Sequence, residues 1–482
     1  MNKVKPVRII GLSAFAVVII TLLGSCGSRT EEKRLSDIES YIDSRPVLKV
    51  FTESEKIDSI LFYNKCTMKK ILYLSLVLWI PLLFGCEQDD NPSDKLIERK
   101  DFVLTRSEMD FIQQNNGFAL ELFKRVAKME GDRSTLISPL SVTMDFGMVS
   151  NGASGKTLTE INNVLGYKDG SVEGLNAFCK SMLEQSSKVD PSTTVEIGNA
   201  AVINKNLVPL RDAFTKAIKT SYDAEVVYKN FGKDDVKGLV NKWSDKKTHG
   251  MIPSILDQQP GADSYAYFLN SVYFKGIWTE TFDKANTKEE EFKLEDGSRS
   301  KVRMMWQKND FIYGGITGVC DALCLPYGNE AYRMVILLPQ EGKTIEDVKA
   351  GLDLHSWNVL MSDMKNKTEV DVKIPVFETS TDLLDLKDAL YSMGIKGAFS
   401  MGSADFSNMT NAKVYVNDVL HKARIKVDEQ GSEVAAVTVI GMSGAAGPGF
   451  KTPEFHADHP FIYAITEVSS GAIFFIGQYT GK

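Results

Sequence analysis

The feature that most restricts how this chain folds is that nothing divides its last 380 or so residues into parts. Between residues 105 and 482 there is no Gly-, Pro- or Ser-rich linker and no internal repeat that would split the chain into domains. Hydrophobic residues make up 43% and charged residues 25% of the chain, the balance of a globular protein with a large core. Helical patterns come first, and strand patterns dominate the second half. We therefore expect one large α+β domain over residues 105–482.

The spacing of apolar residues predicts individual elements within this domain. Apolar side chains recur every three to four residues over 111–127 and again over 140–149, which indicates two helices. Short segments that are apolar, or that alternate between apolar and polar residues, indicate strands. The expected strands are 266–274, 301–305, 333–339, 370–376 and a final pair within 462–476 that breaks at Ser469-Ser470-Gly471.

The N-terminus contains two export signals in series. Basic residues precede an apolar run that ends at Cys26, and the same plan recurs from Met68 to Cys86. Each run is shorter than the roughly 18 apolar residues that a membrane-spanning helix needs. Both endings resemble the lipobox of bacterial lipoproteins, whose cysteine is lipidated and becomes the new N-terminus. We expect residues 68–85 to be a lipoprotein signal peptide and Cys86 to carry the lipid.

Residues 1–67 are interpreted as an extension that arises from a mis-assigned start codon or from a fusion with an upstream reading frame, with Met68 as the true start. Two alternatives remain open. Cleavage at Cys26 would leave residues 71–85 in or on the membrane, or the two apolar runs would form a spanning hairpin. In the first alternative the first signal would be genuine and Cys26 would be the candidate lipidation site.

The part of the chain after the second signal is acidic. Residues 1–85 hold 12 of the 56 Lys and Arg residues and 8 of the 63 Asp and Glu residues, so without them the formal net charge changes from −7 to −11. Residues 86–104 form a polar tether whose first residues, Glu87-Gln88-Asp89-Asp90, resemble the acidic tethers of surface lipoproteins. We expect an exported protein that is lipid-anchored to the bacterial outer membrane or cell surface, with its domain outside the cytoplasm.

Composition argues against several classes of function. The sequence has no basic block of the kind that nucleic-acid binding requires. Six cysteines are too few for a disulfide scaffold and show no paired zinc-ligand spacing, so Cys320 and Cys324 are interpreted as small core residues. We expect no metal, no cofactor and no nucleic-acid partner.

Three motifs resemble catalytic or ligand-binding signatures but are incomplete. The segment 151–157 lacks the first glycine of a phosphate-binding loop. Ser443 lacks the last glycine of a hydrolase nucleophile elbow, because Ala445 stands there. His456 and His459 fit no zinc-ligand spacing and indicate a solvated strand entrance. We expect that the protein is not an enzyme, and a hydrolase built on Ser443 is the weakest hypothesis.

Residues 429–451 are the most unusual segment. Over 432–440 the residues are small or β-branched, and Glu433 carries the only charge. At the period of a strand, one face is uncharged: Ser432, Val434, Ala436, Thr438 and Ile440. Residues 441–449 contain four glycines and a proline, which predicts an exposed loop. The segment is either a latent strand joined to an exposed bait or an ordinary edge strand followed by a loop.

Motifs along nearly the whole domain resemble the serpin family in order and spacing. They include Ile137–Ser141, Leu269–Trp278, Leu325–Tyr327, Val335–Pro339, His421–Ala423, Glu429–Glu433 and Gly471–Gly477. Residues 1–104 lie outside the resemblance. It implies an α+β serpin fold with three β-sheets, about eight or nine helices and an exposed reactive-centre loop at about 429–451.

The resemblance also implies a mechanism, suicide-substrate inhibition of serine proteases, with cysteine proteases as further candidates. The protease attacks the loop and forms an acyl-enzyme, and the freed strand then inserts into the central sheet and traps the protease. Insertion demands an inward face without charge, which Ser432 and its neighbours satisfy. Val434 departs from the family's usual alanine, and we expect it to slow insertion. The hinge residues would be Glu429, Gly431, Ser432, Glu433, Val434, Ala435, Ala436, Val437 and Thr438.

The family's register also places the bond that the protease would cut. Seventeen residues counted from Glu429 put the scissile bond between Ala445 and Ala446, with Gly444 or Met442 as alternatives. The residue before the cut is therefore small or apolar, and no Lys or Arg occurs over 432–450. Elastase-like, subtilisin-like or papain-like proteases are the expected partners. A non-inhibitory serpin that acts as a binding module is the alternative function.

Five further residues match the region where the family's central sheet opens. Ser138, Ser141, Asn270 and His421 match a polar cluster (the shutter) beneath the two strands that must part, where small hydroxyl and amide groups can exchange partners. Trp278 matches the tryptophan at the insertion point (the breach), although by itself it could equally be a core residue. Residues 171–190 contain only two lysines, so no heparin cofactor is expected. We expect a monomer.

Overall fold

The computed structural model describes residues 98–482 except 168–170, 382 and 433–451. The described residues all belong to one of two compact units, Ser93–Lys482. Both expected lipidation sites, Cys26 and Cys86, lie outside the described residues. No helix in the described ranges combines the length and the apolar character that a membrane span requires.

The helices match the patterns expected from the sequence. The described ranges contain nine α-helices and two short 3₁₀ helices: α5 (Arg106–Glu130), α6 (Pro139–Ser150), α7 (Gly155–Leu165), α8 (Val172–Gln185), α9 (Asp212–Tyr222), α10 (Val236–Lys247), η2 (Lys284–Asn286), α11 (Ile345–Gly351), α12 (Leu354–Asp363), α13 (Lys387–Met393) and η3 (Gly397–Phe399). The two helices expected at 111–127 and 140–149 are confirmed as parts of α5 and α6. Helix α5 begins earlier because Thr105 and Glu108 form a capping box.

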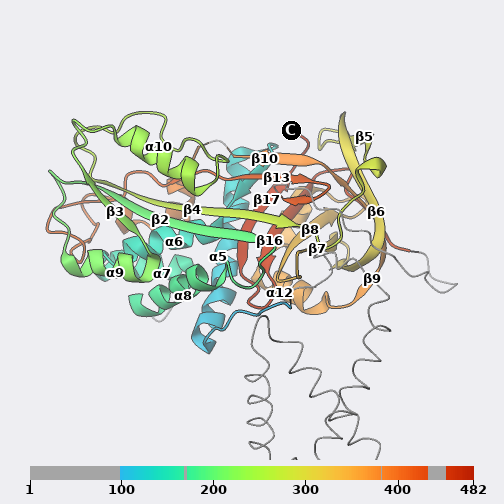
Figure 1. Cartoon of the computed structure of the whole chain (residues 1–482), viewed down its shortest axis with the longest axis horizontal. Helices are drawn as coiled ribbons and strands as arrows, with labels where there is room; N and C mark the ends of the chain where they lie inside the picture. The colour runs from blue at the N-terminus through green and yellow to red at the C-terminus, as the bar shows by residue number, and fades with distance from the viewer. Residues whose placement is uncertain (1–97, 168–170, 382, 433–451) are drawn as a thin grey trace, which may run out of the picture. The chain divides into compact units, whose positions relative to one another are not determined.

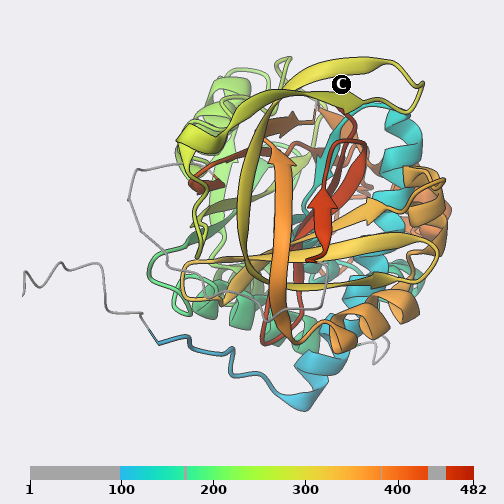
Figure 2. The ribbon, with the colours of Figure 1, turned by 90° about the vertical axis from the view of Figure 1, so that its right-hand side faces the viewer.

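The strands form three sheets in the described ranges. The nine-stranded sheet has the order β1-β17-β16-β8-β7-β6-β9-β15, and β5 also pairs with β6. Its members are β1 (Thr135–Ile137), β5 (Lys288–Lys293), β6 (Arg299–Ile316), β7 (Cys320–Tyr327), β8 (Tyr332–Pro339), β9 (Lys367–Pro375), β15 (Glu454–His456), β16 (Phe461–Glu467) and β17 (Ile473–Tyr479). The turned view shows β9, in orange, running beside the curved β6, in yellow (Figure 2).

The six-stranded sheet has the order β10-β13-β14-β4-β2-β3. Its members are β2 (Thr194–Asn204), β3 (Glu225–Lys229), β4 (Ala266–Ile277), β10 (Phe377–Ser380), β13 (Arg424–Asp428) and β14 (Gly431–Ser432). The third sheet pairs β11 (Leu384–Asp385) with β12 (Leu420–His421). All the strands expected from the sequence are present, and the final pair, β16 and β17, breaks where expected.

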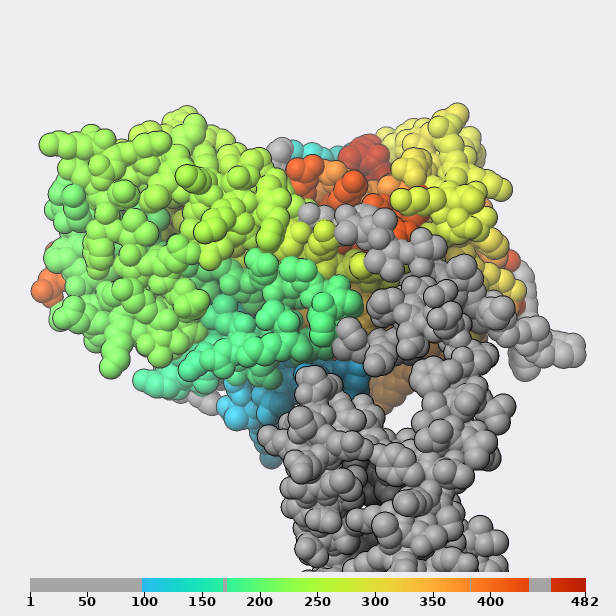
Figure 3. Space-filling model, in the orientation of Figure 1, coloured from blue at the N-terminus to red at the C-terminus, as the bar shows by residue number. Residues whose placement is uncertain are grey.

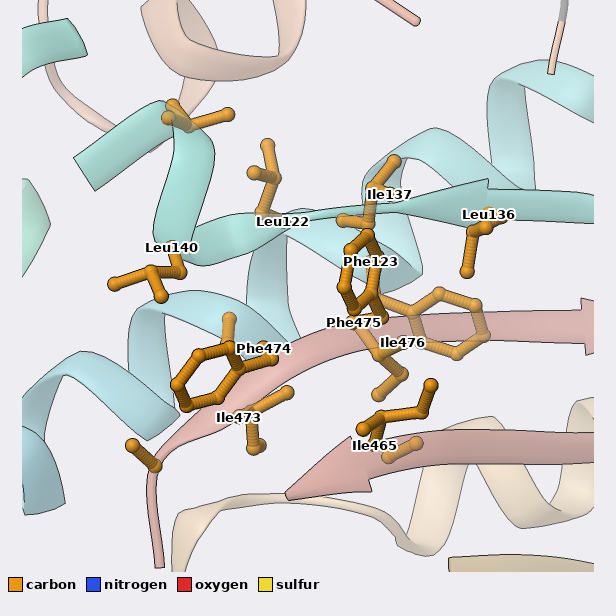
Figure 4. Packing of buried hydrophobic residues seen from close by; sticks show 14 of the residues in the cluster. Leu122, Phe123, Leu136, Ile137, Leu140, Ile465, Ile473, Phe474, Phe475 and Ile476 are labelled. Atoms are coloured by element: carbon orange, nitrogen blue, oxygen red, sulfur yellow. The ribbon is translucent and has the colours of Figure 1, made fainter. Parts of the chain in front are cut away.

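Helices cover both faces of the six-stranded sheet. Helix α10 lies on one side of β2 and β4, and α6 to α9 lie on the other (Figure 1). In the space-filling view, residues near 200–260, in green, occupy the left part of the visible face, and residues near 290–310, in yellow, occupy its upper right (Figure 3). The largest core cluster joins α5 and α6 to the last two strands: Phe123 and Leu140 pack beside Phe474 and Ile476 (Figure 4).

The fold class expected from the sequence is confirmed. Helices and strands are mixed along the chain, and the described part contains three sheets and nine α-helices. The six-stranded sheet is the one that positions the candidate site, because it contains β4, β13 and the two-residue strand β14.

Candidate functional site

The six-stranded sheet is incomplete between β4 and β13. Strand β14 lies between them and pairs with both, but it consists of Gly431 and Ser432 only. Below these two residues, β4 continues back to Ala266 and β13 to Arg424, and the described sheet contains no strand between them. The facing edges of β4 and β13 therefore lack the ladder partner that sheet strands normally have.

A cavity of about 340 Å³ occupies this gap. Residues 265–274 form one wall, residues 414–425 form the opposite wall, and α6 forms the floor. The end of α10 and the segment after it contribute to the lining on the other side of the sheet. We call this cavity, between β4 and the segment 414–425, the slot. Among the described residues, no strand occupies this position in the sheet.

Strand β14 closes the upper end of the slot and is held there by aromatic side chains. Ser432 is fully buried, and its Oγ lies 2.6 Å from the phenol oxygen of Tyr327. Burial raises the pKa of Tyr327, so the phenol keeps its proton for this hydrogen bond. Trp278 stacks on Tyr327 at a centroid distance of 4.4 Å and donates its indole N–H to the carbonyl of Asp428 at 2.9 Å. Trp278 thus lies at the end of the slot where β14 sits.

The turn that leads into β14 is also fixed. The side chain of Glu429 is 3% exposed and accepts a hydrogen bond from Arg303 Nη2 at 2.6 Å. At Gly431 the φ angle is 150°, and a Cβ there would lie 2.1 Å from the carbonyl oxygen of Gly276. Only glycine permits this close approach to β4. The residues at the start of the expected hinge are therefore tightly held.

Three of the four residues expected in the polar cluster meet at the floor of the slot. Ser138 caps α6: its Oγ accepts from the Ser141 N–H at 3.2 Å and donates to the carbonyl of Phe474 at 2.9 Å. The backbone N–H of Ser138 donates to His421 Nε2 at 3.1 Å. These bonds connect the start of α6 to the wall that contains His421.

Asn270 lies on the opposite wall and does not join this cluster. Its Nδ2 donates to Asn199 Oδ1 at 2.8 Å and to the carbonyl of Gly198 at 3.2 Å, both on β2. Its Oδ1 is buried without a hydrogen-bond partner among the described residues. The expected cluster therefore does not bridge the slot.

Burial of His421 predicts a loss of stability in mild acid. Burial lowers the pKa of His421 from 6.5 to about 4, because the low-dielectric surroundings disfavour the imidazolium. The neutral imidazole therefore contributes stability above the unfolded-state pKa, and this is lost as the pH falls from 6.5 towards 4. This pKa shift corresponds to a decrease of about 3 kcal/mol in the free energy of unfolding. We expect urea unfolding at a series of pH values to show this decrease.

His421→Gln is the matched control, because an amide oxygen can accept from the Ser138 N–H but does not titrate. The variant should lack the His421 contribution to the decrease between pH 6.5 and 4. Parallel stability curves for the two proteins would contradict the assignment.

The remaining residues expected at the site lie outside the described residues. They are the hinge residues Glu433, Val434, Ala435, Ala436, Val437 and Thr438 and the scissile-bond candidates Met442, Gly444, Ala445 and Ala446. Ser443, the hydrolase candidate, is also outside them.

The other ligand-binding candidates have structural partners. His456 Nε2 lies 2.8 Å from Asp371 Oδ1, and His459 contacts Asp458 and the carbonyl of Pro339. Cys320 and Cys324 are buried in β7, and burial raises the pKa of both thiols. No cluster of metal ligands occurs in the described ranges.

Two residues at the slot have no specific role in the sequence-based interpretation. Tyr327 ends the motif Leu325-Pro326-Tyr327, which contributed to the family resemblance without indicating a contact with Ser432. Asp145 is the only charged residue of α6, and it lines the slot. A lone acid in an apolar helix was the signal that could have identified it.

Known proteins share both the sequence pattern and the fold. A family model described as "Serpin (serine protease inhibitor)" matches residues 113–481. Iripin-8 of Ixodes ricinus is 32% identical over 78% of this chain and 94% of its own length. The human leukocyte elastase inhibitor is 31% identical over 76% of this chain and 98% of its own length. The crystal structure of tengpin, a thermophilic serpin, in its native state has a TM-score of 0.70 at 28% identity and covers 80% of this chain and 97% of tengpin.

Proposed function

Because the chain belongs to the serpin family, we propose that it inhibits serine proteases, and cysteine proteases as further targets, by trapping the acyl-enzyme. The segment 433–451 is the bait, and after cleavage its first part becomes the missing strand of the six-stranded sheet. The observation that carries this proposal is the open slot directly below β14. The protein acts as a monomeric suicide substrate and not as a turnover enzyme.

The register of β14 supports insertion of the uncharged face. Ser432 is paired with Val427 of β13 and with Gly276 of β4. The same register, continued along the chain, sets Val434 between Ile425 and Phe274, which are both buried. It sets every second residue after Ser432 towards α6, and all of these are uncharged.

The charged residue of the segment would face the other way. In the continued register Glu433 lies between Lys275 on β4 and Lys426 on β13. Lys426 is exposed and Lys275 is partly exposed, and neither forms an ion pair with any described residue. Insertion would therefore place the carboxylate between two cations on the wetter face of the sheet, where its charge need not be removed from water.

The continued register also explains the split polar cluster. Thr438 would arrive between His421 on one wall and Asn270 on the other. Its hydroxyl group can donate to Asn270 Oδ1, which now has no partner among the described residues. The polar residues would then be joined across the slot by the inserted strand, which stabilises the inserted state.

The choice of target protease rests on the residues at the proposed cut. The scissile bond is proposed between Ala445 and Ala446, with Gly444 or Met442 as alternatives to Ala445. A small or apolar residue at this position suits elastase-like, subtilisin-like and papain-like proteases. The relative named leukocyte elastase inhibitor is consistent with this choice.

The decisive experiment is to mix the purified protein with pancreatic elastase and with subtilisin and to examine the products on a denaturing gel. We expect a covalent complex that survives SDS. It should join the protease to the N-terminal fragment of the inhibitor, which ends at the residue before the cut. Cleavage within 433–451 without such a complex would support the non-inhibitory alternative, and no cleavage at all would remove both proteases as targets.

We also propose that the protein is a lipoprotein, exported and held at the outer membrane or cell surface through Cys86. The proposal rests on Lys69-Lys70, the apolar run and Leu83-Phe84-Gly85-Cys86, which together form a complete signal. Several acyl chains on one N-terminal cysteine hold a protein firmly at a membrane, whereas one chain holds it only marginally.

Cys86→Ser, expressed from Met68, is expected to move the protein from the membrane fraction to the soluble fraction. Immunoblots of the two fractions measure the change. Cys26→Ser in the full-length protein is the matched control, and it should leave the distribution unchanged. Loss of membrane retention with Cys26→Ser but not with Cys86→Ser would show that the first signal is the working one.

A further inference from the structure

A single acidic side chain, Asp145, lies on the floor of the slot. Ser138, Ser141, Asp145 and Val149 all line the cavity, and their spacing puts them on one face of α6. The Asp145 side chain is partly exposed towards the slot. Its Oδ1 is shielded from solvent and has no hydrogen-bond partner among the described residues. A shielded carboxyl oxygen without a hydrogen-bond partner lowers the stability of the fold, so its presence here calls for an explanation.

The two ends of α6 locate Asp145 along the slot. At its first turn, Ser138 is bonded to His421. The turn after its last residue packs beside Phe214, and the Phe214 ring lies 6.1 Å from the ring of Phe268 on β4. Asp145 therefore lies below the stretch of the slot between His421 and Phe268.

The proposed insertion would cover this carboxyl group. If the inserted strand continues the register of β14, Thr438 would lie opposite Asn270 and Ile440 opposite Phe268, and both side chains would point towards α6. Their arrival displaces the solvent above Asp145 and leaves the charged form without water or a cation. The protonated acid tolerates this environment much better than the carboxylate does.

Resting on the proposed function, we propose that Asp145 must be protonated for the loop to insert, so that in alkaline solution insertion takes up one proton from solvent. The carboxyl group is neutral whenever the inserted strand covers it. Burial already raises the pKa of Asp145 to about 8 while the slot is open, and insertion raises it further. Below this pKa the group is already protonated and insertion is independent of pH. Above it, each pH unit slows insertion by up to tenfold, because the proton must first be bound.

Other titratable groups line the same slot or pack against α6. On the other side of the helix, Gly147 faces Tyr222, which packs with Cys179. Burial raises the pKa of Tyr222 and raises that of Cys179 to about 12, so neither changes charge between pH 7 and 9.5. The elements β16 and β17 contribute the uncharged Ile465 and Phe475. The remaining titratable groups that line the slot are Asp263, Tyr265, Tyr267, Tyr273, Tyr415, Asp418, His421, Lys422 and Arg424.

Asp145→Asn isolates the contribution of Asp145, because it keeps the size of the side chain, cannot ionise and leaves all the other groups in place. The rate of SDS-stable complex formation with subtilisin is measured at several pH values between 7 and 9.5 for both proteins. The ratio of the variant's rate to the native rate removes the pH dependence of the protease. We expect this ratio to rise by about tenfold or more over this range.

Two further variants keep the test interpretable. Asp310→Asn, at an exposed position of β6, should behave like the native protein. Asp145→Ser replaces Asp145→Asn if the amide does not fold. A constant ratio, with complexes formed normally at pH 7, would overturn the coupling and leave the proposed function standing. Absence of any complex and of any stabilisation after loop cleavage at pH 7 would instead remove the proposed function, and the coupling with it.

Discussion

Cleavage of the loop near Ala445 is expected to raise the melting temperature of the protein by roughly 20 °C. The freed segment can fill the slot, where no described strand pairs with the facing edges of β4 and β13 below Ser432. Each backbone hydrogen bond that it forms contributes about 0.5–1.5 kcal/mol, and its uncharged face adds apolar burial. A net gain on the order of 10 kcal/mol, at about 2 °C per kcal/mol for a domain of this size, gives the expected increase.

Thermal unfolding followed by circular dichroism, at one scan rate for intact and cleaved protein, measures this change. One scan rate is essential, because a kinetically trapped protein unfolds at a temperature that depends on the rate of heating. The N-terminus of the C-terminal fragment confirms that the cut lies within 433–451. An unchanged melting temperature after a single cut there would show that the slot does not accept the segment.

Ser432→Arg is expected to convert the protein from an inhibitor into a substrate. Ser432 is fully buried and bonded to Tyr327, so a guanidinium group there must lose its water without gaining an anionic partner. A cost of several kcal/mol at the first inward position slows insertion, so that hydrolysis of the acyl-enzyme becomes faster than insertion. We expect the number of inhibitor molecules consumed per trapped protease to rise at least tenfold.

Titration of protease activity against inhibitor concentration measures this stoichiometry. Ser432→Thr is the matched control, because it keeps the hydroxyl group and adds only a methyl group, and it should still trap the protease. Cleaved Ser432→Arg should also lack most of the thermal stabilisation expected for the native protein. If the arginine variant traps protease with the native stoichiometry, Ser432 is not an inward-facing hinge residue.

Much of the fold could be predicted from the sequence, because the relevant signals are local or periodic. The 3.6-residue pattern of α5 and α6 and the apolar runs of β4 and β8 each depend on neighbouring residues only. The order of the serpin-like motifs then identified the fold class and its three sheets, and the match over residues 113–481 agrees with this.

The candidate site could be predicted only in part. The sequence singled out Ser138, Ser141, Asn270, His421 and Trp278, but it could not show which of them touch. Asn270 bonds to β2 and not to His421, because the pairing register of β2 and β4 brings Asn199 opposite to it. Strand pairings across many residues of intervening chain are set by the whole sheet, so no local pattern reports them.

By itself, the sequence determined the elements, the family and the uncharged face of the segment after Ser432, because these depend on which side chains follow each other. Only the tertiary structure decided that β14 already separates β4 from β13, that a cavity of about 340 Å³ lies below it, and that Asp145 faces this cavity without a partner. The physical reason is that desolvation and missing hydrogen bonds are properties of the assembled surroundings. The Asp145 carboxyl group acquires its raised pKa only when the assembled fold buries it.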